Sequence, residues 1–267
     1  MNAPVPVLMY HALAREPSEA TRALSVSPEA FAEQLAVLED LGRHPVTTAD
    51  LAAHWRTQGR SPLPENPVLI TFDDGYEGVH RHALPLLVKH GFPATLFVST
   101  GWLRGAHDTG GGLDTMLDWD QVRDLAAGGV EIGGHSHTHP QLDQLDDEAL
   151  WSELIRCKEI VAAELGTVPV SFAYPYGYSS RRVRQRVRAA GFRQALAVGN
   201  GLARRAQGPY ALQRLTVRRS TTTEEFARLV QGRAIARNFA GDRALTKGYA
   251  LVRRARQVRR KAIRTRV

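Results

Sequence analysis

The strongest constraint on the fold is a short apolar run, Val68 to Phe72, that ends in two adjacent aspartates and a glycine. Its length and β-branched composition are typical of a strand covered on both faces of a parallel sheet. Asp73 and Asp74 then fall at the carboxyl end of this strand, the functional edge of a βα barrel or an open α/β sheet. Because side chains alternate along a strand, we expect the two carboxylates to divide into a metal ligand and a general base. A solvated Asp-Asp-Gly turn is the alternative.

Three histidines lie within five residues after a second predicted strand, Val130 to Gly134. They are His135, His137 and His139. A catalytic zinc takes three protein ligands and keeps one position open, so two histidines and one carboxylate would complete such a site. Pro140 disfavours the α conformation at His139, which predicts a loop and not a zinc-binding helix. A histidine cluster that binds nothing is the alternative.

A third predicted strand, within Ser171 to Gly177, is broken by a proline and a glycine. A tight turn at the edge of a sheet can donate a backbone N–H to an oxyanion, which acyl-transfer chemistry needs. Taken alone, the sequence Tyr-Pro-Tyr-Gly also fits a purely structural turn.

In their order along the chain, TFDDGY, HSHTH and FAYPYG resemble the motifs of the polysaccharide deacetylases, carbohydrate esterase family four, also called the NodB-homology domain. The resemblance extends from about Val5 to about Val217. It implies an α/β fold, a distorted (β/α) barrel of the polysaccharide deacetylase type. It also implies a divalent metal, usually Zn²⁺, and hydrolysis of an N-acetyl group on a sugar.

The resemblance also assigns a role to each motif residue. One aspartate and two histidines would bind the metal, namely Asp74, His135 and His139. Asp73 would be the general base, and the backbone N–H of Tyr176 would donate to the oxyanion.

Two departures from the family pattern concern the base and the acid. Ala173 stands where the third motif normally has an arginine that pairs with the base. Arg214, on a late apolar segment, is the proposed substitute, and an ordinary surface arginine is the alternative. The late Leu-x-His element, which normally supplies the acid histidine, is absent. His11 instead follows the first predicted strand, as in a permuted subgroup that includes biofilm poly-N-acetylglucosamine deacetylases, and we assign it as the general acid; a polar residue that caps the strand is the alternative.

Length and composition favour one catalytic domain, residues 1–240, followed by a basic tail, residues 241–267. A chain of 267 residues with 43% hydrophobic residues can fill one large core. Trp102 and Trp119 flank a glycine-rich segment, Gly105 to Thr115, that could form a flexible loop on the substrate side. Either tryptophan could stack on a sugar, although core packing suits Trp119 better. Helices and strands are expected to alternate, with helices at Ser27 to Gly42, Val79 to His90, Asp146 to Leu165, Arg181 to Ala190 and Thr222 to Val230, and further strands at Ala94 to Ser99 and Ala195 to Val198.

The net charge of +8 is concentrated in the tail. Residues 241–267 hold ten basic residues and one acidic residue, which leaves 25 basic and 26 acidic residues in the rest of the chain. Apolar residues recur among these charges at roughly helical spacing, so the tail is either a basic helix that lies on an anionic membrane or a solvated, disordered segment. Nucleic-acid binding is not expected, because no aromatic platform or binding motif accompanies the charge.

The cellular location is expected to be the cytoplasm, with peripheral attachment to the inner face of the membrane through the tail. The single cysteine, Cys157, excludes an intrachain disulfide, and the N-terminus shows no secretion signal. An N-acetylated glycan or a lipid-linked amino sugar is therefore the expected substrate.

Two functions remain open. The first is a metal-dependent hydrolase that removes an N-acetyl or formyl group from an amino sugar in a polysaccharide or a lipid-linked precursor. The second is a catalytically silent carbohydrate-binding member of the same fold, which would follow if Ala173 has abolished the function of the base.

Overall fold

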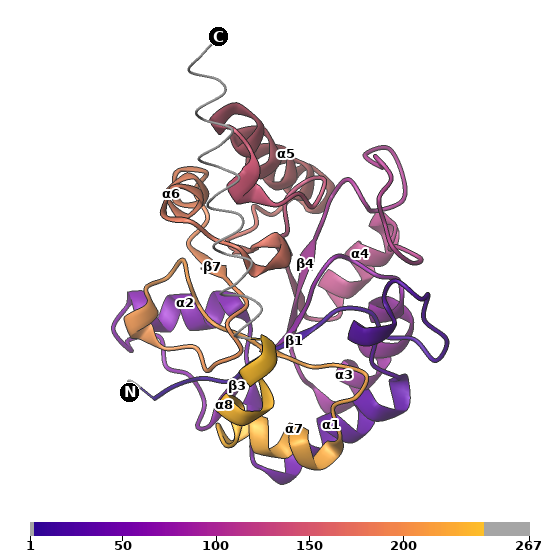
Figure 1. Ribbon diagram of the computed structural model, residues 1–267, viewed down its shortest axis with the longest axis vertical. Coiled ribbons are helices and arrows are strands. Elements are labelled where there is room, and N and C mark those ends of the chain that lie inside the picture. The colour runs from indigo at the N-terminus through magenta and orange to yellow at the C-terminus, as the bar shows by residue number, and fades with distance from the viewer. Residues whose placement is uncertain (1–2, 243–267) are drawn as a thin grey trace.

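The computed structural model describes residues 3–242, which form one curved parallel sheet with helices on its outer side (Figure 1). The strands, in chain order, are β1 (Val7–Tyr10), β2 (His44–Pro45), β3 (Pro67–Phe72), β4 (Ala94–Val98), β5 (Val130–Gly134), β6 (Ser171–Ala173), β7 (Gln194–Leu196) and β8 (Leu215–Thr216). The α-helices are α1 (Pro28–Asp40), α2 (Thr48–Arg56), α3 (Leu84–His90), α4 (Trp119–Ala127), α5 (Asp147–Leu165), α6 (Arg181–Ala189), α7 (Thr223–Val230) and α8 (Ile235–Asn238).

The strand order confirms the predicted distorted barrel. Along the sheet the order is β7-β6-β5-β4-β3-β1-β8, with β2 paired to the start of β3. The two ends of this path are joined by the segment that leads into β8. Leu212 forms a parallel bridge with Leu196 of β7, and three residues later Leu215 pairs with Leu8 of β1. One short segment therefore spans the gap between β7 and β1.

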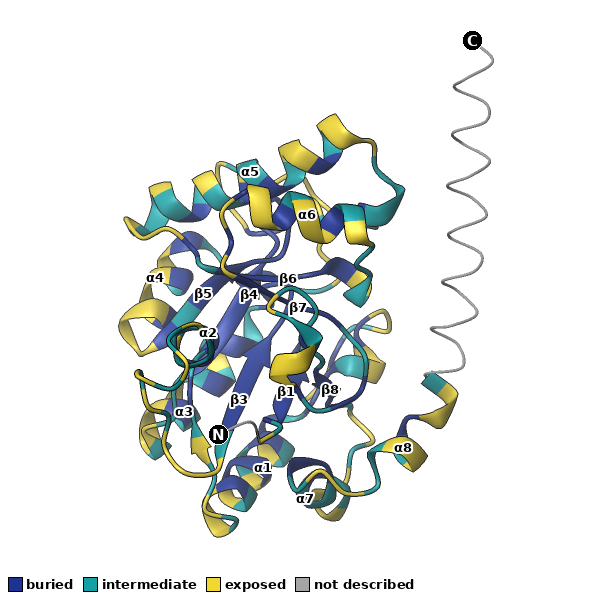
Figure 2. Cartoon of the chain, turned by 90° about the vertical axis from the view of Figure 1, so that its left-hand side faces the viewer, coloured by how far each residue is buried: buried dark blue, intermediate teal, exposed yellow. Residues whose placement is uncertain are grey.

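The strands are buried because helices cover the outer face of the sheet and side chains fill its interior (Figure 2). Every residue of β1 and β4 is buried, as expected for a parallel sheet. Helix α1, for example, packs an apolar stripe of Phe31, Leu35 and Leu38 into the main core. The main core continues to Phe239, near the end of the described residues.

Helix starts follow the expected capping chemistry. The side chains of Ser27, Ser180 and Thr222 each accept a hydrogen bond from a backbone N–H in the first turn of α1, α6 and α7. Asp146 caps α5 in the same way.

The segment Val79 to His90 differs from the single helix that we predicted. It begins as a π-helical turn, Val79–Ala83, and becomes α-helical only at Leu84. Pro85 lies in the first turn of α3, and a proline there has no N–H with which to continue the preceding helix. The predicted strand at Ala195 to Val198 was also displaced, since β7 comprises Gln194–Leu196.

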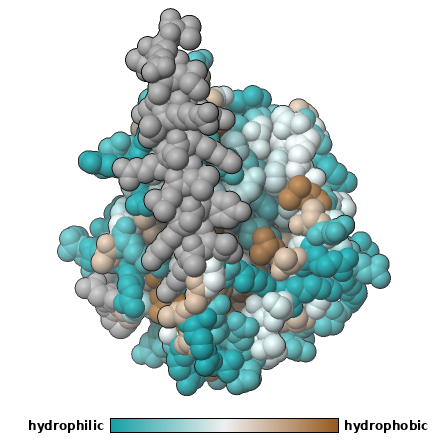
Figure 3. Space-filling view, viewed as in Figure 1, coloured by the Kyte–Doolittle hydropathy of each residue, from teal (hydrophilic) through white to brown (hydrophobic). Residues whose placement is uncertain are grey.

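The surface seen in Figure 3 is mostly hydrophilic or neutral, with small hydrophobic spots. Among the residues that the structure describes, no helix has the length and apolar character needed to cross a membrane. The predicted basic tail begins at Gly241. Apart from Gly241 and Asp242, it lies outside the described residues, and so do the predictions made for it.

Candidate active site

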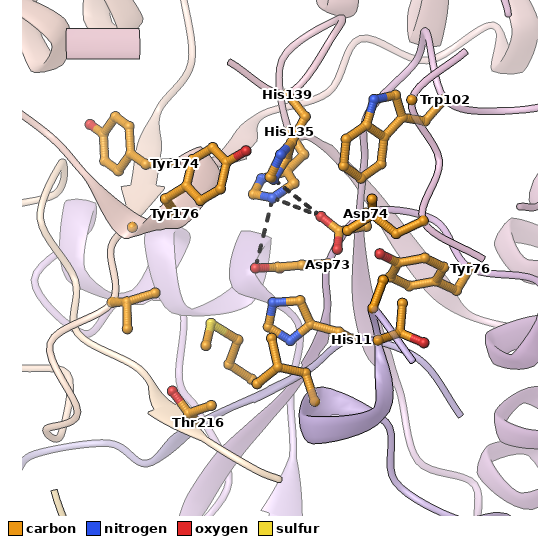
Figure 4. A pocket seen from close by; sticks show the side chains of 18 of the residues that line it. His11, Asp73, Asp74, Tyr76, Trp102, His135, His139, Tyr174, Tyr176 and Thr216 are labelled. Atoms are coloured by element: carbon orange, nitrogen blue, oxygen red, sulfur yellow. Dashed lines mark ion pairs between the residues drawn. The ribbon is translucent and has the colours of Figure 1, made fainter. Parts of the chain in front are cut away.

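The carboxyl ends of β1, β3 and β5 bring the predicted site residues together (Figure 4). Tyr10 and Phe72 are partners in the register of β1 and β3, so His11 and Asp73 follow side by side. The Asp73 N–H donates to the Tyr10 carbonyl at 3.0 Å, which extends this pairing by one residue. On the other side, the histidine loop leaves β5 directly at His135, whose N–H donates to the carbonyl of Val98 at the end of β4.

Asp74, His135 and His139 form a compact group of candidate metal ligands. The ligand atoms lie within 4.8 Å of one another. The Oδ1 atom of Asp74 is 3.3 Å from Nε2 of His135 and 3.3 Å from Nε2 of His139. This Oδ1 atom is buried and has no hydrogen-bond partner. A buried carboxylate oxygen between two imidazole nitrogens fits a divalent cation, because two histidines and one carboxylate are a common ligand set for catalytic zinc.

The two histidines are oriented by different means. His135 donates from Nδ1 to the carbonyl of Ala173 at 2.8 Å. Because a carbonyl can only accept, Nδ1 carries the proton of this hydrogen bond, and the other ring nitrogen, Nε2, faces Asp74. His139 instead packs between two aromatic rings, with centroid distances of 4.5 Å to Trp102 and 4.7 Å to Tyr176. Both arrangements direct an imidazole Nε2 atom toward the same carboxylate.

The charges around the site favour bound positive charge. Burial and the neighbouring His135 lower the pKa of His139 to about 4, so this imidazole is neutral at pH 7 and its lone pair is free to bind a metal. Burial alone would lower the pKa of His135, but the carboxylates of Asp73 and Asp74 outweigh burial and raise it. The same two carboxylates would attract a metal cation.

Asp73 is held by a buried arginine from the far end of the sequence. The guanidinium of Arg214 donates from NH1 to Oδ1 and from NH2 to Oδ2 of Asp73, each at 2.7 Å, and the arginine side chain is 0% exposed. Burial would raise the pKa of Asp73, but Arg214 and His135 outweigh it and hold this pKa below its usual range. Arg214 therefore pairs with Asp73, as expected of a substitute for the missing motif arginine, and the alternative of a surface arginine is wrong.

The closure of the half-barrel explains why Arg214 reaches the base. The segment between β7 and β1 carries Arg214 between Leu212 and Leu215, both of which are buried. Its guanidinium points inward and lies 5.7 Å from the ring centroid of Phe97 on β4. Phe97 packs in the same cluster as Ala173. Because the side chain of Ala173 is small, Phe97 and the guanidinium of Arg214 can occupy the space beside it.

Four non-glycine residues of the three motifs have a positive φ angle. They are Asp74 (76°), Ser136 (68°), His139 (57°) and Tyr176 (58°). Such angles cost free energy and occur preferentially at functional sites. The loop conformation predicted for His139 is confirmed, and the hydroxyl of Ser136 accepts a hydrogen bond from the His139 N–H at 3.1 Å.

Tyr176 lies in a tight turn that only glycine can complete. Gly177 has φ 72°, and a Cβ atom there would meet the backbone nitrogen of Val198 at 2.7 Å. Its N–H donates to the Tyr174 carbonyl at 2.7 Å, which closes the turn. The side chain of Tyr176 is 52% exposed and lies beside Tyr178, with ring centroids 6.0 Å apart.

These residues line a pocket of about 770 Å³, within the range for small-molecule sites. His11, Asp73, Asp74, His135, His139 and Tyr176 all belong to its lining. The glycine-rich loop contributes Thr109, Gly110, Gly111 and Leu113 to the lining of this pocket. Trp102 also lines the pocket, whereas Trp119 is buried in the main core.

The histidine loop is also held by residues that have no distinguishing local sequence pattern. Glu153 of α5 accepts hydrogen bonds from the N–H groups of His137 and Thr138, both at 2.8 Å, and from the Thr138 hydroxyl at 2.6 Å. His137 turns away from the triad and contacts the hydroxyl of Thr100 at 2.9 Å. An acidic residue on a helix can be predicted to contact this loop only once the loop and helix have been placed together.

Comparisons with known proteins identify the family of the chain. Residues 60–195 match the family described as Polysaccharide deacetylase, and the chain belongs to this family. Its relatives and structural neighbours are polysaccharide deacetylases, which are hydrolases that act on carbon–nitrogen bonds. The predicted family and enzyme class are therefore confirmed.

Two curated relatives illustrate the range of the similarity. The chain is 29% identical over 215 residues to the putative polysaccharide deacetylase YxkH of Bacillus subtilis, which covers 80% of this chain and 72% of the relative. It is 25% identical over 244 residues to the poly-β-1,6-N-acetyl-D-glucosamine N-deacetylase of Escherichia coli K12, covering 78% of this chain. The chain spans only 36% of the length of that second relative.

Solved structures extend the likeness to the whole barrel. The deacetylase PplD of Streptococcus pyogenes, in complex with acetate, aligns with a TM-score of 0.76 at 25% identity and covers 87% of this chain and 99% of its own. IcaB from Ammonifex degensii aligns with a TM-score of 0.71 at 25% identity and covers 85% and 97%.

Proposed function

We propose that this chain is a metal-dependent hydrolase that removes an N-acetyl group from an amino sugar of a glycan or of a lipid-linked glycan precursor. The observation that carries the proposal is the unpartnered Oδ1 atom of Asp74 between two histidine nitrogens, next to a second carboxylate that a buried arginine holds ionised. The names of the relatives support the substrate class, because they include deacetylases of poly-N-acetylglucosamine, of chitooligosaccharides and of peptidoglycan.

Asp74, His135 and His139 are the proposed ligands of the metal, which we expect to be Zn²⁺. When bound, a divalent cation supplies Lewis-acid chemistry, since it polarises an acetyl carbonyl and makes a water molecule more acidic. The residues of the chain perform the other steps. Asp73 takes a proton from the attacking water, and Arg214 keeps both of its oxygens in place and ionised.

The oxyanion and the leaving amine each need a partner on the protein. We assign the backbone N–H of Tyr176 to the oxyanion, supported by the rigid turn at Gly177. We assign His11 to the leaving nitrogen, because an amine leaves readily only when it is protonated. His11 lines the same pocket, and its buried Nδ1 atom has no hydrogen-bond partner in the described part of the chain.

The Arg214–Asp73 pair favours this proposal over a catalytically silent carbohydrate-binding protein. A binding module gains nothing from a buried, oriented carboxylate beside a metal site. The silent alternative depended on the loss of the motif arginine at position 173, and Arg214 supplies a guanidinium to the same carboxylate.

Release of acetate from N-acetylglucosamine oligomers, followed by mass spectrometry of the sugar, tests the proposal. The zinc-loaded wild type should produce free amino groups, and Asp73→Asn should reduce the rate by about 10²- to 10⁴-fold while it retains the metal. Glu224→Gln, at an exposed position on α7 outside the pocket, is the control for charge. Release of formate from N-formyl sugars, measured in parallel, distinguishes the two acyl groups. A folded, zinc-loaded wild type that binds these sugars and releases neither acid would favour the silent alternative.

A further inference from the structure

The last strand directs a polar side chain toward the pocket beyond those that the proposed reaction uses. Leu215 and Val217 are buried in the main core. Thr216, between them, faces the other way and lines the pocket. Because side chains alternate along an extended chain, Arg218 falls on the same side as Thr216, and it lines the pocket as well. In Figure 4, Thr216 lies on the far side of His11 and Asp73 from the triad.

Arg218 gives this part of the pocket a positive charge of its own. Within residues 3–242, it is the only arginine or lysine that lines the pocket. The guanidinium of Arg214 is occupied by Asp73 and is fully buried. The side chain of Arg218 is 35% exposed, and its guanidinium carbon lies 5.8 Å from the ring centroid of Phe239.

The guanidinium of Arg218 already forms an ion pair with a carboxylate of the chain. NH2 of Arg218 lies 2.6 Å from Oδ1 of Asp242, which also lines the pocket. Only one nitrogen–oxygen contact joins the pair, and the Asp242 side chain is 26% exposed. By contrast, two contacts join Arg214 to Asp73. Partly exposed ion pairs contribute little free energy, so an incoming anion can displace the carboxylate of Asp242.

We propose that Arg218 forms an anion-binding subsite that recognises a carboxylate or phosphate group on the amino-sugar substrate. Asp242 occupies this subsite until the substrate replaces it. The inference rests on the proposed deacetylase function, and it adds a requirement for an acidic substituent outside the acyl group. A guanidinium suits this task because its donors match two oxygens of a carboxylate or phosphate at once.

Calorimetric titration with matched sugars tests the subsite by affinity and not by turnover. N-acetylglucosamine is the neutral ligand, N-acetylglucosamine 1-phosphate carries a phosphate, and N-acetylmuramic acid carries a carboxylate. We expect the wild type to bind at least one acidic sugar about tenfold more tightly than the neutral one. The acidic sugar that is preferred identifies the anionic group.

Arg218→Gln should reduce that preference by about 10- to 100-fold, as expected for the loss of a charge-assisted hydrogen bond. Arg218→Lys should retain part of it. A phosphate that contacted only the metal would keep its affinity in Arg218→Gln. Arg228→Gln, which removes the same charge from an exposed pair with Glu224 on α7, is the control and should leave the preference unchanged.

Asp242→Asn should act in the opposite direction, because it removes the competing carboxylate. The preference for the acidic sugar should increase, and this gain should vanish when Arg218→Gln is also present. A misfolded variant cannot produce such a gain. The proposal is overturned if the wild type shows no preference for either acidic sugar, or if Arg218→Gln behaves like Arg228→Gln. Failure to release acetate would instead count against the proposed function, since the affinities are measured separately.

Discussion

Removal of the Arg214 guanidinium should lower the stability of the folded protein, because it leaves the carboxylate of Asp73 without its partner. In Arg214→Met, Asp73 would remain buried without the partner that contacts both of its oxygens at 2.7 Å. Breaking a buried ion pair by removal of one partner costs about 3–5 kcal/mol in the free energy of unfolding. Arg228→Met, which breaks a pair with an exposed Glu224 on α7, should cost less than about 1 kcal/mol.

The loss should depend on pH in a direction that identifies Asp73. In the wild type the pKa of Asp73 is lowered, so its stabilising contribution is present above the ordinary aspartate pKa and disappears as the pH falls through the lowered value. Without Arg214, burial raises the pKa of Asp73, and the penalty is relieved as the pH falls through the raised value. Urea denaturation should therefore show the largest difference between the two proteins near pH 7 and a smaller one toward about pH 4.

A second substitution makes this prediction sharper. Asp73→Asn in the Arg214→Met background removes the unpaired charge and should recover most of the lost stability, because a neutral pair avoids the cost of a buried charge. The reasoning would be refuted if Arg214→Met were no less stable than Arg228→Met at pH 7, or if the difference grew as the pH fell.

Three further predictions concern the acid, the histidine loop and the cysteine. His11→Ala should slow deacetylation of an N-acetyl sugar by about 10²- to 10⁴-fold and affect hydrolysis of an activated aryl acetate far less, because that leaving group needs no proton; equal losses would mean that His11 is structural. Glu153→Gln should weaken zinc binding by about 10- to 100-fold in a chelator competition assay, since this carboxylate holds the histidine loop, and an unchanged affinity would contradict that role. Cys157 is buried, and burial raises its pKa to about 12, so iodoacetamide should label it at pH 8 only after unfolding. Rapid labelling of the native protein would contradict this prediction, because it would show that the core around Cys157 opens to solvent.

Much of the site could be predicted because each motif follows a strand. The carboxyl ends of parallel strands lie at one edge of the barrel, so Asp74 and His135 meet although about sixty residues separate them. Arg214 could be predicted only as one of two alternatives. Its sequence shows a lone arginine in an apolar segment, and only the closure of the half-barrel directs that arginine inward.

The residues that sequence reasoning missed act through long-range pairing or helix placement. Glu153 contacts the histidine loop from α5, and no local pattern distinguishes it from its acidic neighbours. Arg218 and Asp242 meet only because the chain returns to the pocket after α8. The π-helical turn before α3, by contrast, had a local signal in Pro85 that the apolar pattern alone did not take into account.

The central claim is that Asp74, His135 and His139 hold a divalent metal that the reaction requires. Elemental analysis of the purified protein after dialysis against Zn²⁺, with the wild type and a His135→Ala/His139→Ala variant side by side, tests it most directly. We predict about one zinc per wild-type chain and almost none in the folded double variant, with acetate release lost in parallel. Full zinc occupancy in the double variant, or undiminished acetate release without zinc, would contradict the account.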